Sequence, residues 1–236
     1  MTLSFKEDHI SQIPALMMLE KVGYTYLTPA EAMELRGGNA SNVLLEPILR
    51  EQLTKINTVQ VSSQRTTVFS EQNITAGIQA LRNLPMAEGY MTASQVAYDL
   101  LTAGKTLEQI VDGDKKSYVM QYIDWKHIEN NAFHVTEEFA VSRTGMSDTY
   151  RPDIVLFVNG IPLCVIECKR PDIKDSLKQA ISQHLRNQKE DGIRSLYVYS
   201  ALLLATNVNE VSYATTATPE KFWSKWTEQF ADKNAE

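Results

Sequence analysis

One run, Arg151–Lys169, constrains the fold of this chain more than any other part of the sequence. It reads RPDIVLFVNGIPLCVIECK, with apolar arms at Ile154–Val158 and Leu163–Lys169 on either side of Asn159-Gly160. An Asn-Gly pair between two β-type segments is a strong signal for a tight hairpin turn. The run therefore predicts two antiparallel, central strands, and the periodicity after it predicts an amphipathic helix over 175–191.

Two charged residues close the second arm, which is otherwise apolar. Side chains alternate along a strand, so Glu167 and Lys169 share a face with Leu163 and Val165. Burying an unpaired charge there would cost on the order of several kcal/mol. Asp153 begins the partner arm and is the natural third member. Such a group suits metal-assisted phosphodiester hydrolysis. Asp153 and Glu167 would bind Mg²⁺, while Lys169 would orient or deprotonate the attacking water and offset transition-state charge.

Strand register tests this hypothesis. A plain two-residue turn at Asn159-Gly160 would pair Asp153 with Ile166, which faces the opposite way from Glu167. A shared site therefore requires either a three-residue loop or a β-bulge beside Asp153.

The bare pattern of an Asp followed by acid-x-Lys is common, and the chain contains a second instance. Asp99 with Asp114-Lys115-Lys116 fits it loosely, but Asp99 lies in a helical pattern and Asp114 in a turn, so this set is rejected. The alternative interpretation of Glu167 and Lys169 is a solvated strand end with an edge lysine.

The remaining sequence predicts an α/β protein of α+β-like character, with a mixed central sheet flanked by helices. We expect one domain, 1–236, with a mainly helical part over about 1–115 and a core over about 116–236, because no repeat or flexible linker divides the chain. The expected helices are 13–23, 28–37 with a capping box at Thr28, 45–56, 74–81, 92–104, 106–111 and a closing helix opened by Thr218-Pro219; the expected further strands are 133–141, 195–200, 201–206 and 211–215.

Charge and cysteine content narrow the classes of function. The net charge of −6 argues against a stand-alone nucleic-acid binder, and the basic residues after Lys169 are interleaved with acids. Cys164 and Cys168 fall in one predicted strand and cannot form a bridge, and no Cys/His cluster indicates zinc. The absence of an apolar leader and of a long apolar run predicts a cytoplasmic protein that does not enter a membrane.

Several segments resemble the amino-terminal part of type I restriction enzyme restriction subunits. They are RPDIVLFVNGIPLCVIECKRP with LKQAISQHLRNQ, and further GYTYL, NVLLEPILREQLTKIN, NNAFHVTEEFAV and YATTATPEKFWSKW, so the resemblance covers most of the chain. It implies a PD-(D/E)xK restriction-endonuclease-like core and a Mg²⁺-dependent, type I site-specific deoxyribonuclease. The family's ATP-dependent motor domains are expected to be absent here, because no G-x-x-x-x-G-K-[ST] loop is present.

The resemblance also assigns residues. Asp153, Glu167 and Lys169 match its metal-binding and catalytic positions, and Gln183 matches the glutamine of a Gln-x-x-x-Tyr pair, although Asn187 stands where the tyrosine would be. A helical glutamate often assists the metal in such nucleases, and Glu7 and then Glu46 are the candidates. His184, on the same helix as Gln183, is expected to be packed or solvated more often than bound to phosphate.

The implied partners are DNA and the modification and specificity subunits of a restriction complex. Two alternatives remain beside the nuclease: a non-catalytic docking module for those subunits, which the acidic charge favours, and a repair nuclease of the same fold. The intact Asp153, Glu167 and Lys169 set favours an active nuclease.

Overall fold

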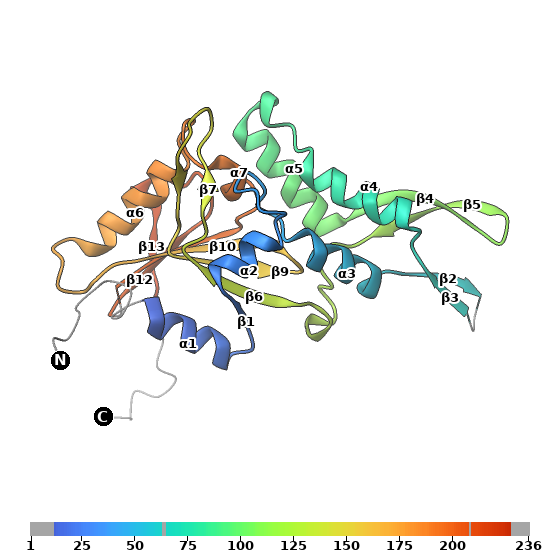
Figure 1. The fold of residues 1–236 in the computed structure, drawn as a ribbon, viewed down its shortest axis with the longest axis horizontal. Helices are drawn as coiled ribbons and strands as arrows, with labels where there is room; N and C mark the ends of the chain where they lie inside the picture. Colours follow the sequence, from blue (N-terminus) through green and yellow to red (C-terminus); the bar gives the residue numbers. More distant parts are fainter. Residues whose placement is uncertain (1–11, 63–64, 208, 228–236) are drawn as a thin grey trace.

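The computed structural model describes residues 12–62, 65–207 and 209–227, and its centre is a seven-stranded sheet (Figure 1). The strands lie in the order β1 (Thr25–Leu27), β6 (Phe133–Glu137), β9 (Ile154–Val158), β10 (Ile161–Cys168), β11 (Leu202–Thr206), β12 (Val211–Ala214) and β13 (Ser224–Lys225). The β1–β6 and β10–β11 pairs are parallel and the other pairs are antiparallel. The mixed sheet with a central, antiparallel β9–β10 pair is therefore confirmed.

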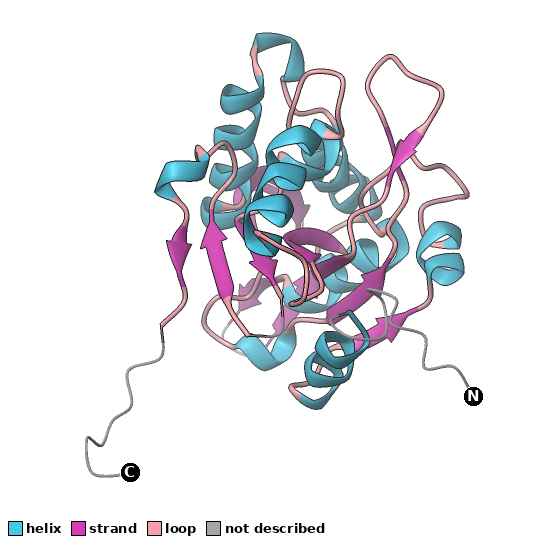
Figure 2. Ribbon diagram, turned by 90° about the vertical axis from the view of Figure 1, so that its left-hand side faces the viewer, coloured by secondary structure: helices cyan, strands magenta, loops and turns pink. Residues whose placement is uncertain are grey.

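Helices lie on both sides of the strands (Figure 2). They are α1 (Ile13–Lys21), α2 (Pro29–Glu34), α3 (Glu46–Ile56), α4 (Glu71–Arg82), α5 (Tyr90–Ala103), α6 (Ser176–Asn187) and α7 (Arg194–Tyr197). Leu16 of α1 packs against Ile154 and Ile166 on one face, whereas α3, α4, α5 and α7 share a larger core with Val155 and Val165 on the other. In the described part of the chain, no helix has the length and apolar character needed to cross a membrane.

The hairpin of β9 and β10 follows from its residues. Most of β9, IVLFV, is buried, as expected of a central strand whose two faces are both covered. Asn159 and Gly160 have φ values of 52° and 80°, which suit a type I′ turn. The Asn159 side chain holds this turn in place, because it accepts the Ala132 N–H at 2.8 Å and donates to the Tyr122 carbonyl at 2.9 Å.

The first half of the chain is less helical than expected. The segment predicted as a helix over 106–111 is instead strand β4 (Lys105–Val111), paired with β5 (Asp114–Met120) in a hairpin that projects from the body (Figure 1). A second hairpin joins β2 (Thr58–Ser62) to β3 (Arg65–Val68). The α2 capping box is confirmed: the Thr28 side chain accepts the Glu31 N–H, and the Glu31 side chain accepts the Thr28 N–H.

Two expectations for the second half are wrong. The segment 195–200 begins as α7 rather than a strand, because the chain must turn there to place Tyr197 and Tyr199 in the core before β11. The closing helix does not form; a short 3₁₀ turn, Glu220–Phe222, leads into β13, which pairs with the open edge of β12. Phe222, Trp226 and Phe230 would line one side of that helix. Phe222 and Trp226 are instead exposed, and Phe230 lies outside the described residues.

Smaller differences concern element ends. Helix α6 stops at Asn187, before the predicted end at Asp191. Strand β6 ends at Glu137, and the next residue, Glu138, has a φ of 46° that interrupts the strand. Beyond this break a separate two-stranded ribbon joins β7 (Val141–Ser142) to β8 (Thr149–Tyr150).

Gly160 lies against the start of α3, where a side chain has no room. An added Cβ would come within 2.6 Å of the Leu45 carbonyl oxygen and 3.1 Å of the Leu49 nitrogen. We expect Gly160→Ala to lower the free energy of unfolding by about 2–5 kcal/mol, because a left-handed backbone costs an L-residue about 1–2 kcal/mol and overpacking adds about 1–3 kcal/mol. Gly113→Ala is the matched control, since Gly113 also has a positive φ but nothing lies within 4 Å. Urea unfolding that gave equal losses for both variants would contradict this contact.

Candidate active site

Asp153, Glu167 and Lys169 meet at the end of the β9–β10 hairpin that lies away from its turn. Ile154 pairs with Ile166, so Asp153 lies opposite Glu167. The Asp153 Oδ2 atom accepts the Cys168 N–H at 2.7 Å. This bond fixes the aspartate against the strand that carries the other two residues.

A β-bulge produces this register. Leu163 is an extra residue between the paired positions Pro162 and Cys164, which restores the parity that the shared site requires. The expected location was wrong: the loop has two residues, and the bulge lies in β10 beside the turn rather than beside Asp153. Two features explain this. The Asn159 side chain fixes a two-residue turn, and Pro162 has no N–H for the ladder, so pairing is easily interrupted next to it.

Glu167 is completely buried, with 0 % of its surface exposed. Burial raises the pKa of the Glu167 carboxyl well above its ordinary value, and the Asp153 carboxylate, which lies within hydrogen-bonding reach, raises it further. The ammonium of Lys169 and the guanidinium of Arg186 oppose this rise. Two carboxylates this close are not both ionised without a compensating cation. The pair is therefore a place where a positive charge is favoured.

Lys169 supplies one such charge from the same strand end. Its Nζ atom lies 3.8 Å from Asp153 Oδ2 and donates to the Cys168 carbonyl at 2.9 Å. Only 12 % of the Lys169 side chain is exposed. The ammonium is thus held beside the acidic pair, and the interpretation of Glu167 and Lys169 as a solvated strand end does not fit their burial.

The acidic pair fits a Mg²⁺ ion by its donor chemistry. Carboxylate oxygens are hard ligands, and Mg²⁺ in nucleic-acid enzymes usually takes one or two of them with waters and phosphate oxygens. Among the residues that the structure describes, no three His, Cys, Asp or Glu side chains are grouped for metal binding. A cation at Asp153 and Glu167 would therefore complete its coordination with water or substrate. Cys164 and Cys168 are buried and form no disulfide with each other.

Helix α6 covers the site through two amide side chains. Gln183 Nε2 donates to Glu167 Oε2 at 2.6 Å, and Asn187 Nδ2 donates to Glu167 Oε1 at 3.2 Å. Residues four apart lie on one face of a helix, so both reach the same carboxylate. The structure thus brings Gln183 to the three residues from the hairpin, and the amide at Asn187 makes a contact of the same kind.

His184 faces away from the open side of the site and is completely buried. Its ring nitrogens lie 3.0 Å from the Tyr197 hydroxyl and 2.9 Å from the Leu204 carbonyl oxygen, and its ring packs against Trp223. The packed role expected for this histidine is confirmed.

Tyr197 contacts the site although no pattern in the sequence pointed to it. It ends α7, and its hydroxyl lies 3.4 Å from Asn187 Nδ2 at the end of α6. Only the path of the chain between α6 and β11 brings this hydroxyl into place, and no spacing or motif encodes that path.

A polar pocket of about 420 Å³ opens in front of Lys169. Its wall is one face of α6, where Lys178, Ser182 and Arg186 follow each other at four-residue intervals beside Gln183. Arg186 is held over the Tyr150 ring, 4.6 Å from its centroid.

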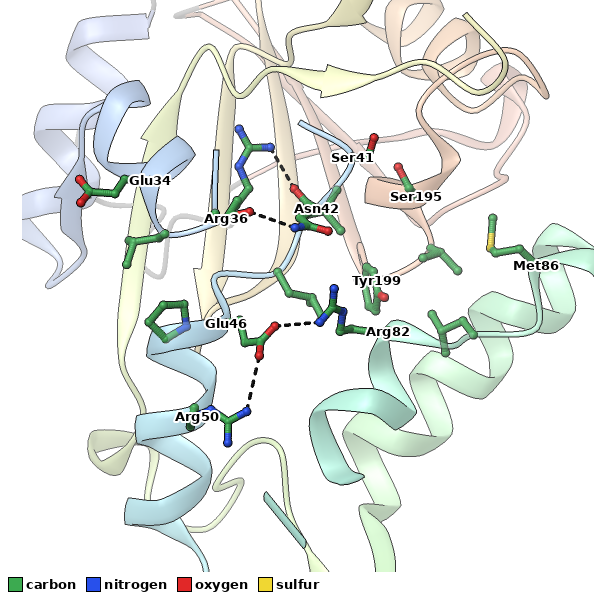
Figure 3. Close-up of a pocket in the computed structure, with 17 residues that line it drawn as sticks. Glu34, Arg36, Ser41, Asn42, Glu46, Arg50, Arg82, Met86, Ser195 and Tyr199 are labelled. Atoms are coloured by element: carbon green, nitrogen blue, oxygen red, sulfur yellow. Dashed lines mark hydrogen bonds and ion pairs between the residues drawn. The ribbon is translucent and has the colours of Figure 1, made fainter. Parts of the chain in front are cut away.

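Of the two glutamates expected to assist the metal, the structure describes only Glu46. Glu7 lies outside the described residues. Glu46 points toward Arg82 and Arg50, at 3.1 and 3.5 Å (Figure 3). It starts α3 beside the hairpin turn, where the Leu45 N–H donates to the Gly160 carbonyl at 2.9 Å, and Asp153 lies at the other end of the hairpin.

Comparison with known proteins finds a family model and relatives that match most of this chain. The family model described as "Type I restriction enzyme R protein N terminus" matches residues 4–222. The chain is 25% identical over 221 residues to a protein of Methanocaldococcus jannaschii whose name describes a type I restriction enzyme MjaIXP endonuclease subunit, covering 93% of this chain and 20% of that protein. It is 29% identical over 208 residues to the type I restriction enzyme HindI endonuclease subunit of Haemophilus influenzae, covering 85% and 18%. The chain thus spans about a fifth of the length of these relatives.

Proposed function

Because the chain belongs to the family of type I restriction enzyme R protein N termini, we propose that it is the Mg²⁺-dependent DNA endonuclease domain of a type I restriction–modification system. In this proposal the chain has a PD-(D/E)xK core, with Asp153, Glu167 and Lys169 as its motif. One observation carries the proposal: a fully buried glutamate, an aspartate within hydrogen-bonding reach and an ammonium group meet at one strand end.

Asp153 and Glu167 would hold the Mg²⁺ ion. When bound, the ion would polarise the phosphoryl group and lower the pKa of a coordinated water. Gln183 and Asn187 keep the Glu167 carboxylate in one orientation, because each amide occupies a different oxygen. Asp153 is held by the Cys168 N–H. Both acidic side chains are thus oriented before the substrate arrives, which reduces the reorganisation needed in the reaction.

Lys169 would act on the water and on the phosphodiester. The attacking water oxygen forms a bond to phosphorus and the bond from phosphorus to the leaving oxygen breaks. One proton of the water passes to solvent, and the leaving oxygen takes up a proton from solvent. The Lys169 ammonium orients this water and stabilises the negative charge that develops on the phosphoryl oxygens. Its bond to the Cys168 carbonyl directs it toward the acidic pair.

The α6 pocket would receive the DNA backbone next to the reacting phosphate. Lys178 and Arg186 bring positive charge, and Ser182 between them offers a hydroxyl donor. Contacts of this kind to phosphates position a duplex without reading its sequence. Glu220 on the opposite wall opposes the phosphates, so this pocket alone gives a modest grip.

Delivery of the DNA would therefore depend on other parts of the restriction complex. The net charge of −6 repels phosphate at long range, and the chain covers about a fifth of its named relatives. In the proposal, ATP-driven motor domains move the DNA, while specificity and modification subunits choose the site and remain partners of this domain. Cleavage then occurs where translocation delivers the phosphate to Asp153 and Glu167.

A Mg²⁺ titration of DNA cleavage by the complete complex tests this proposal. We expect no cleavage after chelation and recovery on adding Mg²⁺, with the response moved to higher Mg²⁺ in Asp153→Asn, because an amide is a poorer Mg²⁺ ligand than a carboxylate. Glu46→Gln is the control, since Glu46 is bound by Arg50 and Arg82 away from the site. If the Asp153→Asn complex cut DNA at the parental level at every Mg²⁺ concentration, the result would favour the docking-module alternative.

A further inference from the structure

A relay of hydrogen bonds runs from Glu167 into the protein interior. It passes from the Glu167 carboxylate to Asn187 at 3.2 Å, to the Tyr197 hydroxyl at 3.4 Å, to His184 at 3.0 Å and to the Leu204 carbonyl at 2.9 Å. Glu167, Asn187, Tyr197 and His184 are each 0 % exposed. Water cannot replace any of these bonds, so each partner depends on the next.

The last bond fixes the direction of all the others. The Leu204 carbonyl can only accept, so His184 Nε2 must carry a proton. Burial lowers the pKa of His184 to about 4, so the ring is neutral at pH 7 and its Nδ1 atom accepts. The Tyr197 hydroxyl therefore donates to Nδ1, and its oxygen is left to accept from Asn187 Nδ2. The second proton of that amide nitrogen points to Glu167 Oε1.

The arrangement holds the carboxylate from two sides. Gln183 occupies Oε2 at 2.6 Å and Asn187 occupies Oε1. The Asn187 amide cannot rotate, because its own oxygen accepts the Arg186 guanidinium at 3.1 Å while its nitrogen lies between Glu167 and Tyr197. The Glu167 carboxylate is thereby held in one orientation, within hydrogen-bonding reach of Asp153.

We propose that Tyr197 is a positioning residue for the metal site, acting through Asn187, with the His184 Nε2–H tautomer as its anchor. This inference rests on the proposed function. Groups that orient a metal ligand commonly change metal affinity or activity by about 10–100-fold when removed.

A neighbouring tyrosine distinguishes this role from ordinary core packing. The Tyr199 hydroxyl is also buried, but it donates to the Leu81 backbone carbonyl at 2.6 Å. It therefore anchors main chain, whereas the Tyr197 hydroxyl contacts two side chains that lead to Glu167. Tyr197→Phe and Tyr199→Phe each remove one buried hydroxyl from the same segment, but only the Tyr197 hydroxyl lies in the relay.

The first experiment titrates the 236-residue chain with MgCl₂ in a calorimeter. For Tyr197→Phe we expect the Mg²⁺ dissociation constant to rise about 10–100-fold. For Tyr199→Phe we expect the parental dissociation constant. Both variants are checked by circular dichroism and urea unfolding, so that a shared loss of stability is separated from a loss of metal affinity. Equal dissociation constants for Tyr197→Phe and the parent would overturn the proposal, as would an equal rise for Tyr199→Phe.

A double substitution tests whether Tyr197 acts through Asn187. If it does, Asn187→Ala combined with Tyr197→Phe binds Mg²⁺ no more weakly than Asn187→Ala alone, because the hydroxyl has lost the group on which it acts. If the double variant instead showed the product of the two single losses of Mg²⁺ affinity, Asn187 and Tyr197 would act independently and the relay would be overturned.

A readout without metal completes the test. In a ¹⁵N-histidine-labelled chain at neutral pH, the His184 Nδ1 atom should be unprotonated, and its signal should move in Tyr197→Phe but not in Tyr199→Phe. A protonated Nδ1 would reverse the donor order and overturn the relay. If the parent chain bound no Mg²⁺ at all, the proposed function would fail together with the role of Tyr197. If the parent and Tyr197→Phe bound Mg²⁺ equally well, only the role of Tyr197 would fail.

Discussion

Lys169→Met in the complete restriction complex should abolish DNA cleavage while ATP hydrolysis continues at the parental rate. The ammonium group lies 3.8 Å from Asp153 Oδ2 and is held by the Cys168 carbonyl, beside the place where the phosphate would react. Removal of one donor that stabilises transition-state charge costs about 10²–10³-fold in rate, and loss of the group that orients the water adds to this. The measurement is the linearisation of a supercoiled plasmid that carries a recognition site, with ATP turnover followed in the same sample.

The choice of methionine keeps the test interpretable. Methionine retains most of the apolar stem of Lys169, so the packing of this side chain, which is only 12 % exposed, is largely preserved. Lys189→Met is the control, because Lys189 is exposed and follows the end of α6. Parental cleavage by Lys169→Met would show that the reacting phosphate lies elsewhere.

Glu167→Gln should make the metal-free chain more stable at pH 8 and change the response of its stability to pH. The pKa of Glu167 is raised in the folded protein, chiefly by burial. The parent is therefore fully stabilised at a pH below the ordinary pKa of a glutamate and loses stability as the pH rises through the raised value. We therefore expect the variant to gain stability relative to the parent as the pH rises from about 4.5 to about 8, because the parent must ionise a buried carboxyl over this range and the variant does not. Urea unfolding with a chelator present measures it.

Addition of Mg²⁺ should make the parent more stable than the Glu167→Gln variant. The parent gains stability on adding Mg²⁺ because the ion binds the folded state, whereas the Glu167→Gln variant offers an uncharged amide in place of a carboxylate. The Gln183 amide can turn to accept from the new side chain, so the packing of the site survives. Glu88→Gln, at an exposed position, is the control and should follow the parent at both pH values. A variant less stable than the parent at pH 8 without metal would contradict the costly burial of this charge.

Local patterns in the sequence were sufficient to predict the acidic hairpin. The apolar arms of β9 and β10, with Asn159-Gly160 between them, encode two central strands and a tight turn without help from distant residues. Parity then required one extra residue if Asp153 and Glu167 were to meet. Pro162 favours an interruption of pairing next to it, but local pattern alone could not place the extra residue at Leu163. The two-residue turn that sets the register depends on how the Asn159 side chain is bound by Tyr122 and Ala132, which lie far away in the chain.

The errors occurred where distant contacts outweigh local pattern. Leu107, Ile110 and Val111 have spacing compatible with a helix, yet Lys105–Val111 pairs with Asp114–Met120 across Asp112-Gly113. Both turn residues have positive φ, and an Asp-Gly pair is itself a hairpin signal that could have identified this strand.

Local pattern also could not predict that Glu167 is buried. A charge at a strand end is usually a surface feature, but α6 and α7 enclose Glu167 and bring Asn187 and Tyr197 against it. These contacts arise from the crossover between β10 and β11, which local periodicity does not specify. Asp153 is likewise more than a surface charge, because its side chain accepts the Cys168 N–H, a bond that Asp153→Ala would remove.

The outermost strands of the sheet affect how this chain can associate with other proteins. In the described part of the chain, β1 has three residues and β13 has two, and they form the two edges of the sheet. Short edge strands, one of them carrying Lys225, offer few unpaired backbone groups to a foreign strand and thereby oppose aggregation. A partner that bound by β-augmentation would gain little main-chain pairing there. Assembly with other subunits is therefore expected to use helical and loop surfaces, leaving the sheet that carries the acidic hairpin undisturbed.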